Sequence, residues 1–358
     1  MINPRRLMGR SEPWVLAAIL ALSFLIQARS GQFYTGNNLV DLVQAMIVPG
    51  LLSVGCMMVI VSGGIDVSFT AVASLAMYVT DRILLSSHYA GNVLLAYVMA
   101  AGLGLIMGAL NGFLIAFLRL PTLVVTLGTA SLFTGLMFGA FSASASDVPP
   151  AIHAHGKEIL FTAVNPQLGL TSNMPSQVLI LIGVFLLAFL LLRYTMLGRG
   201  IYAIGGDEAA AERAGFNVRA IKMFLYCLVG VLAGITGIAR ISLIAYADPS
   251  TMLGMELTVI AAVVLGGVRV SGGVGTLTGT ALGVALMIVL SNSLILIGIP
   301  SYWTRVFTGA VIIIGTGVTA RQIGMKRRLS PGHGGRSSPE PRTAAGEPGP
   351  VTKARETP

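Results

Sequence analysis

Long apolar runs, separated by short polar connections, make up most of this chain. An α-helix rises about 1.5 Å per residue, so about 20 apolar residues cross the ~30 Å hydrocarbon core of a bilayer. The pattern therefore predicts an all-α, polytopic membrane protein with about ten transmembrane helices. The runs fall near residues 14–26, 43–62, 65–80, 91–118, 122–141, 176–193, 221–246, 254–268, 273–297 and 303–320.

Some of these runs depart from a complete span. The runs at 65–80, 122–141 and 254–268 are short or begin at Gly or Pro, which is typical of broken or re-entrant helices. The first run follows several arginines and precedes Ala28-Arg29-Ser30, a pattern that a secretory signal peptide also has. Because many further spans follow, we expect an uncleaved first span.

Composition and charge support a lipid environment. The chain is 54% hydrophobic and 10% charged, whereas an ordinary soluble domain has about 25% charged residues. The net charge of +9 comes from basic residues at the ends of apolar runs, without interleaved aromatic residues, so it indicates a lipid bilayer rather than a nucleic acid as partner. Cys56 and Cys227 lie inside apolar runs and offer no disulfide framework.

The distribution of Lys and Arg predicts the topology. They gather before residue 11, between 193 and 222, and between 321 and 328, and cytoplasmic segments collect such residues. We therefore expect both termini in the cytoplasm. The predicted segments are a cytoplasmic N-terminus (1–13), a transmembrane domain (14–320) with a cytoplasmic loop (194–221) and an external loop (142–175), and a basic, then disordered, cytoplasmic tail (321–358).

The cytoplasmic loop contains signals for a short helix. Asp207 can cap its first turn, Glu208 suits the positive end of its dipole, Ala209 to Ala214 propagate it, and Gly215 can end it. Such a short helix is marginal alone. It is expected to pack against its own bundle or against a partner, and the composition leaves both open. In the external loop, His153 and His155 lack a third ligand nearby, so a solvated loop is favoured over a metal site.

Glycines recur every four residues within several runs, a spacing that lets helix backbones approach closely in lipid. They are Gly104, Gly108 and Gly112, Gly230 and Gly234, and Gly275, Gly279 and Gly283. The stretch GGVGTLTG (272–279) departs from a dinucleotide fingerprint at Thr278 and has no alternating strands and helices around it. The sequence also has no G-x-x-x-x-G-K-[ST] motif, so the chain does not hydrolyse ATP by that route.

Polar groups at membrane depth are costly and are candidates for function. Asp66 either caps a half-helix or belongs to a translocation path. Asn111 and Asn292 join helices more often than they contact cargo, and Glu256 and Arg240 flank an Asp-Pro turn where water or mutual pairing can satisfy both. The full set is Asp66, Asn111, Arg240, Glu256, Asn292 and Arg305.

Four motifs, in a fixed order between Asn37 and Ala320, resemble those of the permease subunits of bacterial ABC importers for monosaccharides. The similarity is to the ribose, xylose and galactose type, which includes autoinducer-2 permeases. The motifs are GGIDVS (63–68), GALNGFLIAFLRLPTLVVTLGT (108–129), GRGIYAIGGDEAAAERAGFNV (198–218) and LGGVRVSGGVGTLTGT (265–280). Phe69, Thr70 and Ser293 depart from the family pattern and put the identity of the substrate in doubt.

The resemblance implies a division of labour within the bacterial inner membrane. The partners would be cytoplasmic ATPase subunits, a periplasmic sugar-binding protein and a second permease chain; ATP and Mg would bind the ATPase, and this chain would bind no cofactor and have no catalytic site. The coupling segment that docks on the ATPase would be Gly205, Gly206, Asp207, Glu208, Ala209, Ala210, Ala211, Glu212, Arg213, Ala214 and Gly215. Candidate groups along the path are Asp66, Ser68, Thr70, Asn111, Thr126 and Asn292.

Three alternatives are weighed against this interpretation. An ABC permease for branched-chain amino acids or nucleosides would use helix N-termini or Arg240 to bind a carboxylate. A proton- or sodium-coupled transporter would need titratable groups within its spans, which only Asp66 and Glu256 approach. A membrane enzyme would need a nucleophile with a base, paired carboxylates or a metal cluster, none of which stands out.

Overall fold

The computed structural model describes residues 12–165 and 169–293, and isolated residues from there to 313. Most of the predicted span at 303–320, Arg305, the first eleven residues and the predicted tail at 321–358 lie outside the described residues. The helices are α2 (Glu12–Ser30), α3 (Gly36–Val61), α4 (Phe69–Ser86), α5 (Leu94–Ala116), α6 (Thr122–Gly135) with a π-helical turn η1 (Leu136–Ala140), α7 (Pro150–Gly156), α8 (Val178–Tyr194), α9 (Met196–Gly206), α10 (Glu208–Arg213), α11 (Val218–Ile244), α12 (Met255–Leu265) and α13 (Leu277–Ser293).

The described residues contain six helices that are long and apolar enough to cross a membrane, namely α2, α3, α4, α5, α6 with η1, and α11. A seventh span results if α8 and α9, which bend by 75°, are counted together, and α12 and α13 are shorter apolar helices. The prediction of an all-α polytopic protein with broken elements is confirmed.

The breaks differ in place from those we predicted. The sharp bend lies at Thr195, between α8 and α9. The run at 122–141 is one continuous span, whereas the run at 65–80 begins with a non-helical stretch before α4. Only the run at 254–268 forms a short helix, α12, as expected for an incomplete span.

The centre of the bundle is formed by α3, α4, α5 and α11, whose apolar residues share one core. Glycines allow α5 and α11 to touch backbone to backbone: an added Cβ on Gly104 would overlap the Gly230 carbonyl oxygen, and one on Gly234 would overlap the Ala100 carbonyl oxygen. The close packing predicted from the glycine spacing is therefore present.

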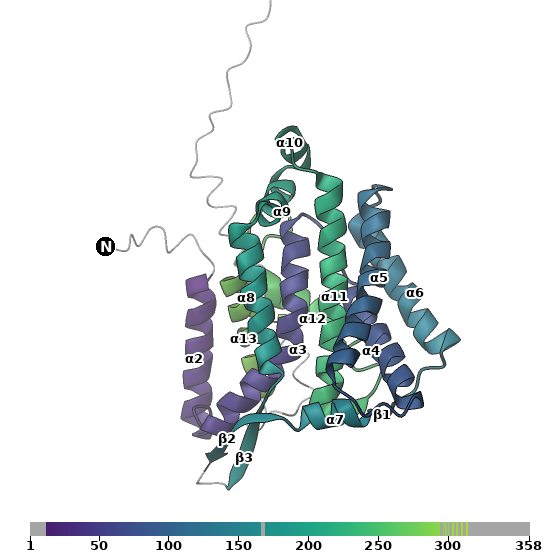
Figure 1. Cartoon of the computed structure of the whole chain (residues 1–358). Helices are drawn as coiled ribbons and strands as arrows, with labels where there is room; N and C mark the ends of the chain where they lie inside the picture. Colours follow the sequence, from purple (N-terminus) through teal and green to yellow (C-terminus); the bar gives the residue numbers. More distant parts are fainter. Residues whose placement is uncertain are drawn as a thin grey trace, which may run out of the picture. The chain divides into compact units, whose positions relative to one another are not determined.

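The two ends of the bundle differ (Figure 1). We call them the α10 end, which carries α9 and α10, and the hairpin end, which carries α7 and the antiparallel hairpin of β2 (Ile159–Asn165) and β3 (Leu170–Pro175). At the hairpin end, β1 (Ser146–Asp147) also pairs with β4 (Tyr246–Ala247). The segment predicted as an external loop is therefore largely regular structure.

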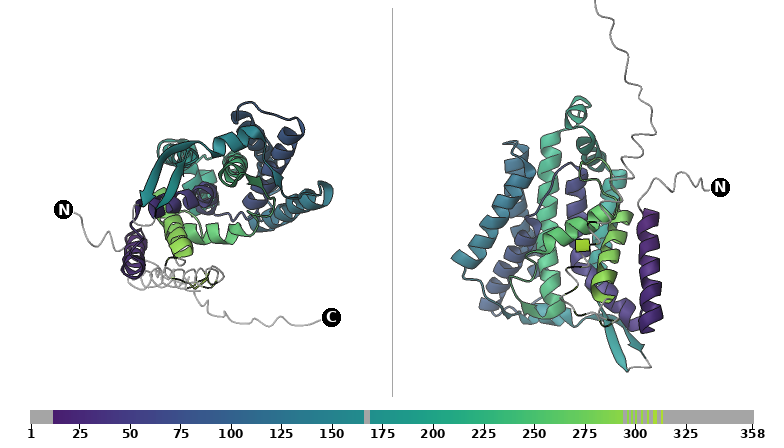
Figure 2. Two further views of the ribbon diagram at one scale, coloured as in Figure 1. Left: turned by 90° about the horizontal axis from the view of Figure 1, so that it is seen from below. Right: turned by 180° about the vertical axis from the view of Figure 1, so that it is seen from behind.

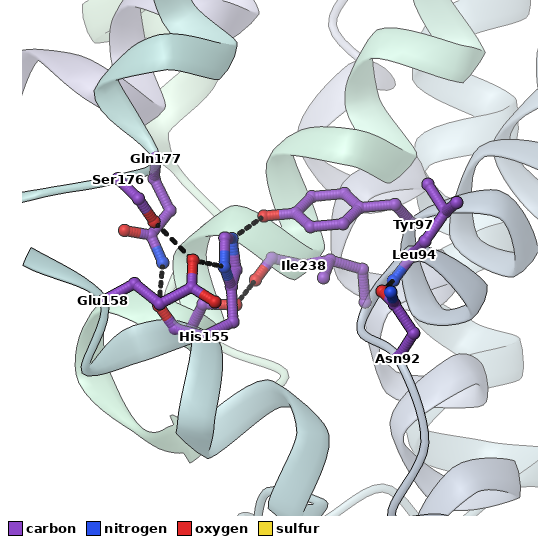
Figure 3. Close-up of polar contacts among 9 residues, drawn as sticks. Asn92, Leu94, Tyr97, His155, Glu158, Ser176, Gln177 and Ile238 are labelled. Atoms are coloured by element: carbon purple, nitrogen blue, oxygen red, sulfur yellow. Dashed lines mark hydrogen bonds and ion pairs between the residues drawn. The ribbon is translucent and has the colours of Figure 1, made fainter.

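His155 joins several elements at the hairpin end (Figure 3). Its Nδ1 lies 2.8 Å from Glu158 Oε2, its Nε2 lies 3.3 Å from the Tyr97 hydroxyl, and its carbonyl accepts from Gln177 Nε2. An ionised carboxylate only accepts hydrogen bonds, so His155 Nδ1 donates to Glu158. His155 thus connects α7 with the starts of α5 and α8, rather than lying in a solvated loop.

The first helix, α2, lies beside α13 (Figure 2). Ile26 and Phe33 pack with Leu42 and Val289 in a small apolar cluster. At the other end of α2, Glu12 Oε1 accepts hydrogen bonds from the Thr276 and Thr278 hydroxyls at 2.5 and 3.1 Å. Both ends of α2 are therefore fixed against the C-terminal part of the described bundle.

Candidate functional site

The short helix predicted in the cytoplasmic loop is α10, and its caps are as expected. The Asp207 carboxylate accepts the Ala210 N–H at 2.9 Å, which satisfies one of the free donors of the first turn. Gly215 follows the helix with a φ of +89°, a conformation that other residues rarely adopt. These local predictions are confirmed.

Most residues of α10 are exposed to solvent. Ala211 is buried, whereas Ala209, Ala210 and Ala214 are exposed. On the side of α11, Glu208 forms a 2.7 Å ion pair with Lys222. The exposed face of α10 therefore carries short alanine side chains, and the Glu208–Lys222 ion pair connects the first turn of the helix to α11.

A hollow of about 640 Å³ lies beside α10. Glu208 and Glu212 line its α10 side, and Arg119, Arg219 and Lys222 bring positive charge to its other walls. A protein segment with both charged and apolar groups would match this lining, because complementary charges fix the register of a docked partner.

Backbone contacts connect α9 to the core. An added Cβ on Gly205 would overlap the Val61 carbonyl oxygen, and the same oxygen accepts the Gly273 N–H at 2.8 Å. The Tyr202 hydroxyl donates to the Gly275 carbonyl at 2.9 Å. The last turn of α9 is therefore locked to the end of α3 and to the loop between α12 and α13.

Directly after α3, residues 62–68 run without helical structure between the α10 end and the start of α4. The Ile65 N–H donates to Thr122 Oγ1 and the Ile65 carbonyl accepts from Thr126 Oγ1, both at 3.2 Å. Side chains of α6 thereby take the place of the missing helical partners of Ile65.

Four of the six predicted path residues meet on this segment. Asp66 Oδ1 accepts from the Ser68 N–H and hydroxyl, each at 2.7 Å, and Asn111 Nδ2 donates to Ser68 Oγ at 2.8 Å. Asp66, Ser68, Asn111 and Thr126 are at most 3% exposed. The network joins the 62–68 segment to α5 and α6, and the structure thus places these residues inside the bundle.

The other two predicted path residues lie apart from this network. The Thr70 hydroxyl donates to Glu256 Oε2 at 2.9 Å, and the same oxygen accepts the Gly254 N–H at 3.0 Å. Glu256 therefore faces α4 and does not pair with Arg240 among the described residues. Of the two possibilities left open for these side chains, water or mutual pairing, mutual pairing is wrong. Asn292 lines a different hollow at the hairpin end, together with Asp41, Gln44 and Arg240.

Asp41 and Gln44 were not among the functional residues predicted from the sequence. Asp41 lies in the second turn of α3, just before the apolar run that we began at residue 43, and Gln44 lies inside that run. The available signal was a polar pair one helical turn into a span, which is uncommon in lipid.

The fold and these sites define a class: a polytopic membrane protein with a buried polar network in an otherwise apolar bundle and an exposed capped helix at one end, as in a membrane transport component. Comparison with known families agrees. Residues 38–315 match the family described as "Branched-chain amino acid transport system / permease component", and the chain belongs to this family.

Several curated relatives cover most of the chain. It is 34% identical over 299 residues to the ribose import permease protein of Escherichia coli K12, covering 84% of this chain and 90% of the relative. It is 30% identical over 303 residues (84% and 80%) to the autoinducer 2 import system permease protein of Yersinia enterocolitica, and 29% identical over 300 residues (84% and 85%) to the L-arabinose ABC transporter permease protein of Azospirillum brasilense. No solved structure matches the chain.

The protein is therefore a permease subunit of the ABC importer type, located in a membrane. Permeases of such importers are not themselves enzymes and work with ATPase and substrate-binding components.

Proposed function

We propose that this chain is the membrane-spanning permease of an ATP-binding cassette importer that moves a monosaccharide across the bacterial inner membrane. The observation that carries the substrate class is the similarity, over 84% of the chain, to permeases named for ribose and L-arabinose, which are both pentoses. A pentose, a hexose or a related sugar is therefore the expected cargo.

The α10 end faces the cytoplasm, together with both termini, in this proposal. The exposed alanines of α10 and the charged hollow beside it suit a cytoplasmic ATPase subunit, which would carry the ATP and Mg. The hairpin end faces the periplasm, where a sugar-binding protein delivers the cargo. A second permease chain completes the pathway.

The coupling segment, residues 205–215, transmits the closure of the ATPase. Because Gly205 touches the end of α3 through backbone atoms, a displacement of α10 moves the Val61 region and the 62–68 segment after it. That segment holds the Asp66, Ser68 and Asn111 network, so its displacement changes the packing of α4, α5 and α6. Packed interfaces switch between discrete arrangements rather than deforming smoothly.

The first test is purification of the tagged full-length chain from its native membranes in mild detergent, with mass spectrometry of the bound proteins. We expect an ATPase with a phosphate-binding loop to co-purify, and ATP-dependent uptake of ribose or arabinose by the reconstituted complex. A chain that transports alone, with uptake abolished by ionophores instead of ATP depletion, would contradict the proposal. Uptake of leucine in place of the sugars would favour the amino-acid alternative, in which Arg240 binds a carboxylate.

A second test addresses the coupling segment. Replacing Ala210 by Asp or Gly215 by Val should uncouple ATP hydrolysis from sugar uptake while membrane levels stay normal. Ala154→Asp is a matched control, since Ala154 is an exposed alanine on the short helix α7 at the opposite end. Normal uptake by the two α10-end variants would remove the assignment of residues 205–215 as the coupling segment.

A further inference from the structure

A polar hollow lies near the hairpin end, between α3, α11, α12 and α13, and two of its polar residues, Asp41 and Asn292, are exposed. Its volume is about 450 Å³, within the range of small-molecule sites, which is about 300–1,000 Å³. Asp41, Gln44, Arg240 and Asn292 are among the residues that line it. This concentration of polar groups requires an explanation, because such groups are costly at membrane depth.

One charged group of this hollow, the Arg240 guanidinium, is incompletely satisfied within the described structure. Arg240 lies one turn before the end of α11, and its Nε is buried without a hydrogen-bond partner in that part of the chain. Glu256, one possible partner, is bonded to Thr70 instead. Because a buried donor without a partner is destabilising, the position favours a ligand that accepts a hydrogen bond from Arg240 Nε.

The backbone of α3 adds an acceptor to the same wall. Pro49 lies inside α3 and has no N–H, so the carbonyl of Ala45, four residues earlier, loses its usual intrahelical donor. Both Ala45 and Pro49 line the hollow. The hollow thus combines a carboxylate, a backbone carbonyl, two amides and a guanidinium.

The remaining walls are apolar. Val48 of α3, Met255 of α12 and Ile288 of α13 line the hollow beside the polar groups. A monosaccharide has the complementary chemistry, because its ring carries hydroxyls that both donate and accept, and its C–H face is apolar. The opposite charges of Asp41 and Arg240 also suit a ligand without net charge.

A second hollow, of about 410 Å³, adjoins the first at Asp41, Gln44 and Leu243. Lys157 and Asn173, from the hairpin end, line it as well. Because the two hollows share these three lining residues, the second is the candidate entrance to the first from the hairpin end.

We propose that the hollow between α3, α11, α12 and α13 is a binding site for the transported monosaccharide, entered from the hairpin end. Asp41 and the Ala45 carbonyl accept from sugar hydroxyls, while Gln44, Arg240 and Asn292 donate to them. This inference rests on the proposed function, and it assigns the sugar contacts to residues that differ from the Asp66 network.

The test is protection of single cysteines by the cargo in the complete importer. Cys56 and Cys227 are first replaced by Ala. Gln44→Cys and Asn292→Cys are then made separately in this background. Two positions are used so that the test still works if one variant fails to assemble. Ser87→Cys, an exposed position at the end of α4, is the control. Each importer is labelled in proteoliposomes with a membrane-impermeant thiol reagent, with and without ribose delivered by the binding protein.

We expect ribose to slow labelling at Gln44→Cys and Asn292→Cys at least about five-fold, as occupancy of about four-fifths of the sites requires, and to leave Ser87→Cys unchanged. Equal labelling rates with and without ribose, in an importer that still transports it, would overturn the site. Failure of the unsubstituted importer to transport any monosaccharide would instead contradict the proposed function.

Discussion

Gly205 and Val61 touch through their backbones: a side chain on Gly205 would overlap the Val61 carbonyl oxygen, and its Cβ would lie 2.6 Å from the Gly273 N–H nitrogen. That carbonyl already accepts the Gly273 N–H, so three segments far apart in sequence meet at one oxygen. The contact makes α9 a rigid extension of the end of α3.

Replacing Gly205 by Ala should therefore disturb the α10 end. The added methyl group has backbone on two sides and cannot be accommodated by a rotating side chain, so we expect overpacking that costs about 1–3 kcal/mol. The expected result is a lower midpoint of thermal unfolding for the purified importer and a lower ratio of transported sugar to hydrolysed ATP.

The neighbouring residue provides the control. Gly206 ends the same helix, but a Cβ added there would meet no atom within 4 Å. Gly206→Ala should keep the unfolding midpoint of the unmodified protein. If the two variants unfold at the same temperature, the Gly205 contact is not important for stability.

The packing of α5 on α11 gives a second prediction. A Cβ on Gly104 would overlap the Gly230 carbonyl oxygen, whereas a Cβ on Gly102, in the same helix, would meet nothing within 4 Å. Gly104→Ala should lower stability by about 1–3 kcal/mol through overpacking, and Gly102→Ala should preserve or slightly raise it, because alanine favours the helix. Thermal unfolding of both variants in one detergent measures the difference.

A third prediction concerns Ser68. Its hydroxyl donates to Asp66 and accepts from Asn111, so Ser68→Ala leaves a buried amide donor without its partner. We expect a loss of about 1–3 kcal/mol in stability. Ser131→Ala is the matched control, because Ser131 is exposed on α6 and bonds only to the Leu127 carbonyl of its own helix. A Ser68→Ala variant as stable as Ser131→Ala would show that the network contributes little.

The hairpin end should respond to acid through Glu158. The hydrogen bond from His155 holds the pKa of this carboxyl below its ordinary value of 4.5. Ionised Glu158 therefore stabilises the fold above about pH 4.5, and this contribution is lost as the pH falls through the lowered pKa. Glu158 is largely exposed, so solvent screening limits the effect to under about 1 kcal/mol.

Unfolding midpoints measured between about pH 7 and about pH 3 check this prediction. Glu158→Gln should unfold at a slightly lower temperature than the unmodified protein at neutral pH, and the two curves should converge in acid. Parallel curves over the whole range would mean that the His155 contact does not stabilise the fold.

Features set by nearby residues were predictable from sequence. The Asp207 cap involves a backbone group three positions away, and Gly215 ends α10 through its own φ angle. Both features therefore depend only on residues within a short stretch of sequence. The spacing of Gly104 and Gly108 predicted close helix packing for the same reason, but their partner on α11 is separated from them by more than a hundred residues and was not identified.

Features that depend on distant partners were not predictable. Glu256 bonds to Thr70, 186 residues away, so the possibility of pairing with the nearby Arg240, one of two left open by the sequence, is wrong. The hollow at Gln44 and Asn292 brings together residues of α3 and α13, two helices that are far apart in the sequence. The β2–β3 hairpin was read as a loop because its apolar residues do not alternate strictly, and a bulge between Ile159 and Phe161 shifts the register.

The contacts between α2 and α13 constrain the order in which the helices can pack during synthesis. Glu12 finds its hydroxyl partners on Thr276 and Thr278, 264 and 266 residues later. At a synthesis rate of about 5–20 residues per second, that interval is on the order of 10 to 50 s. During this time α2 is already in the bilayer while α13 does not yet exist, so α2, the first of the described helices to be made, is among the last of them to reach its final neighbours.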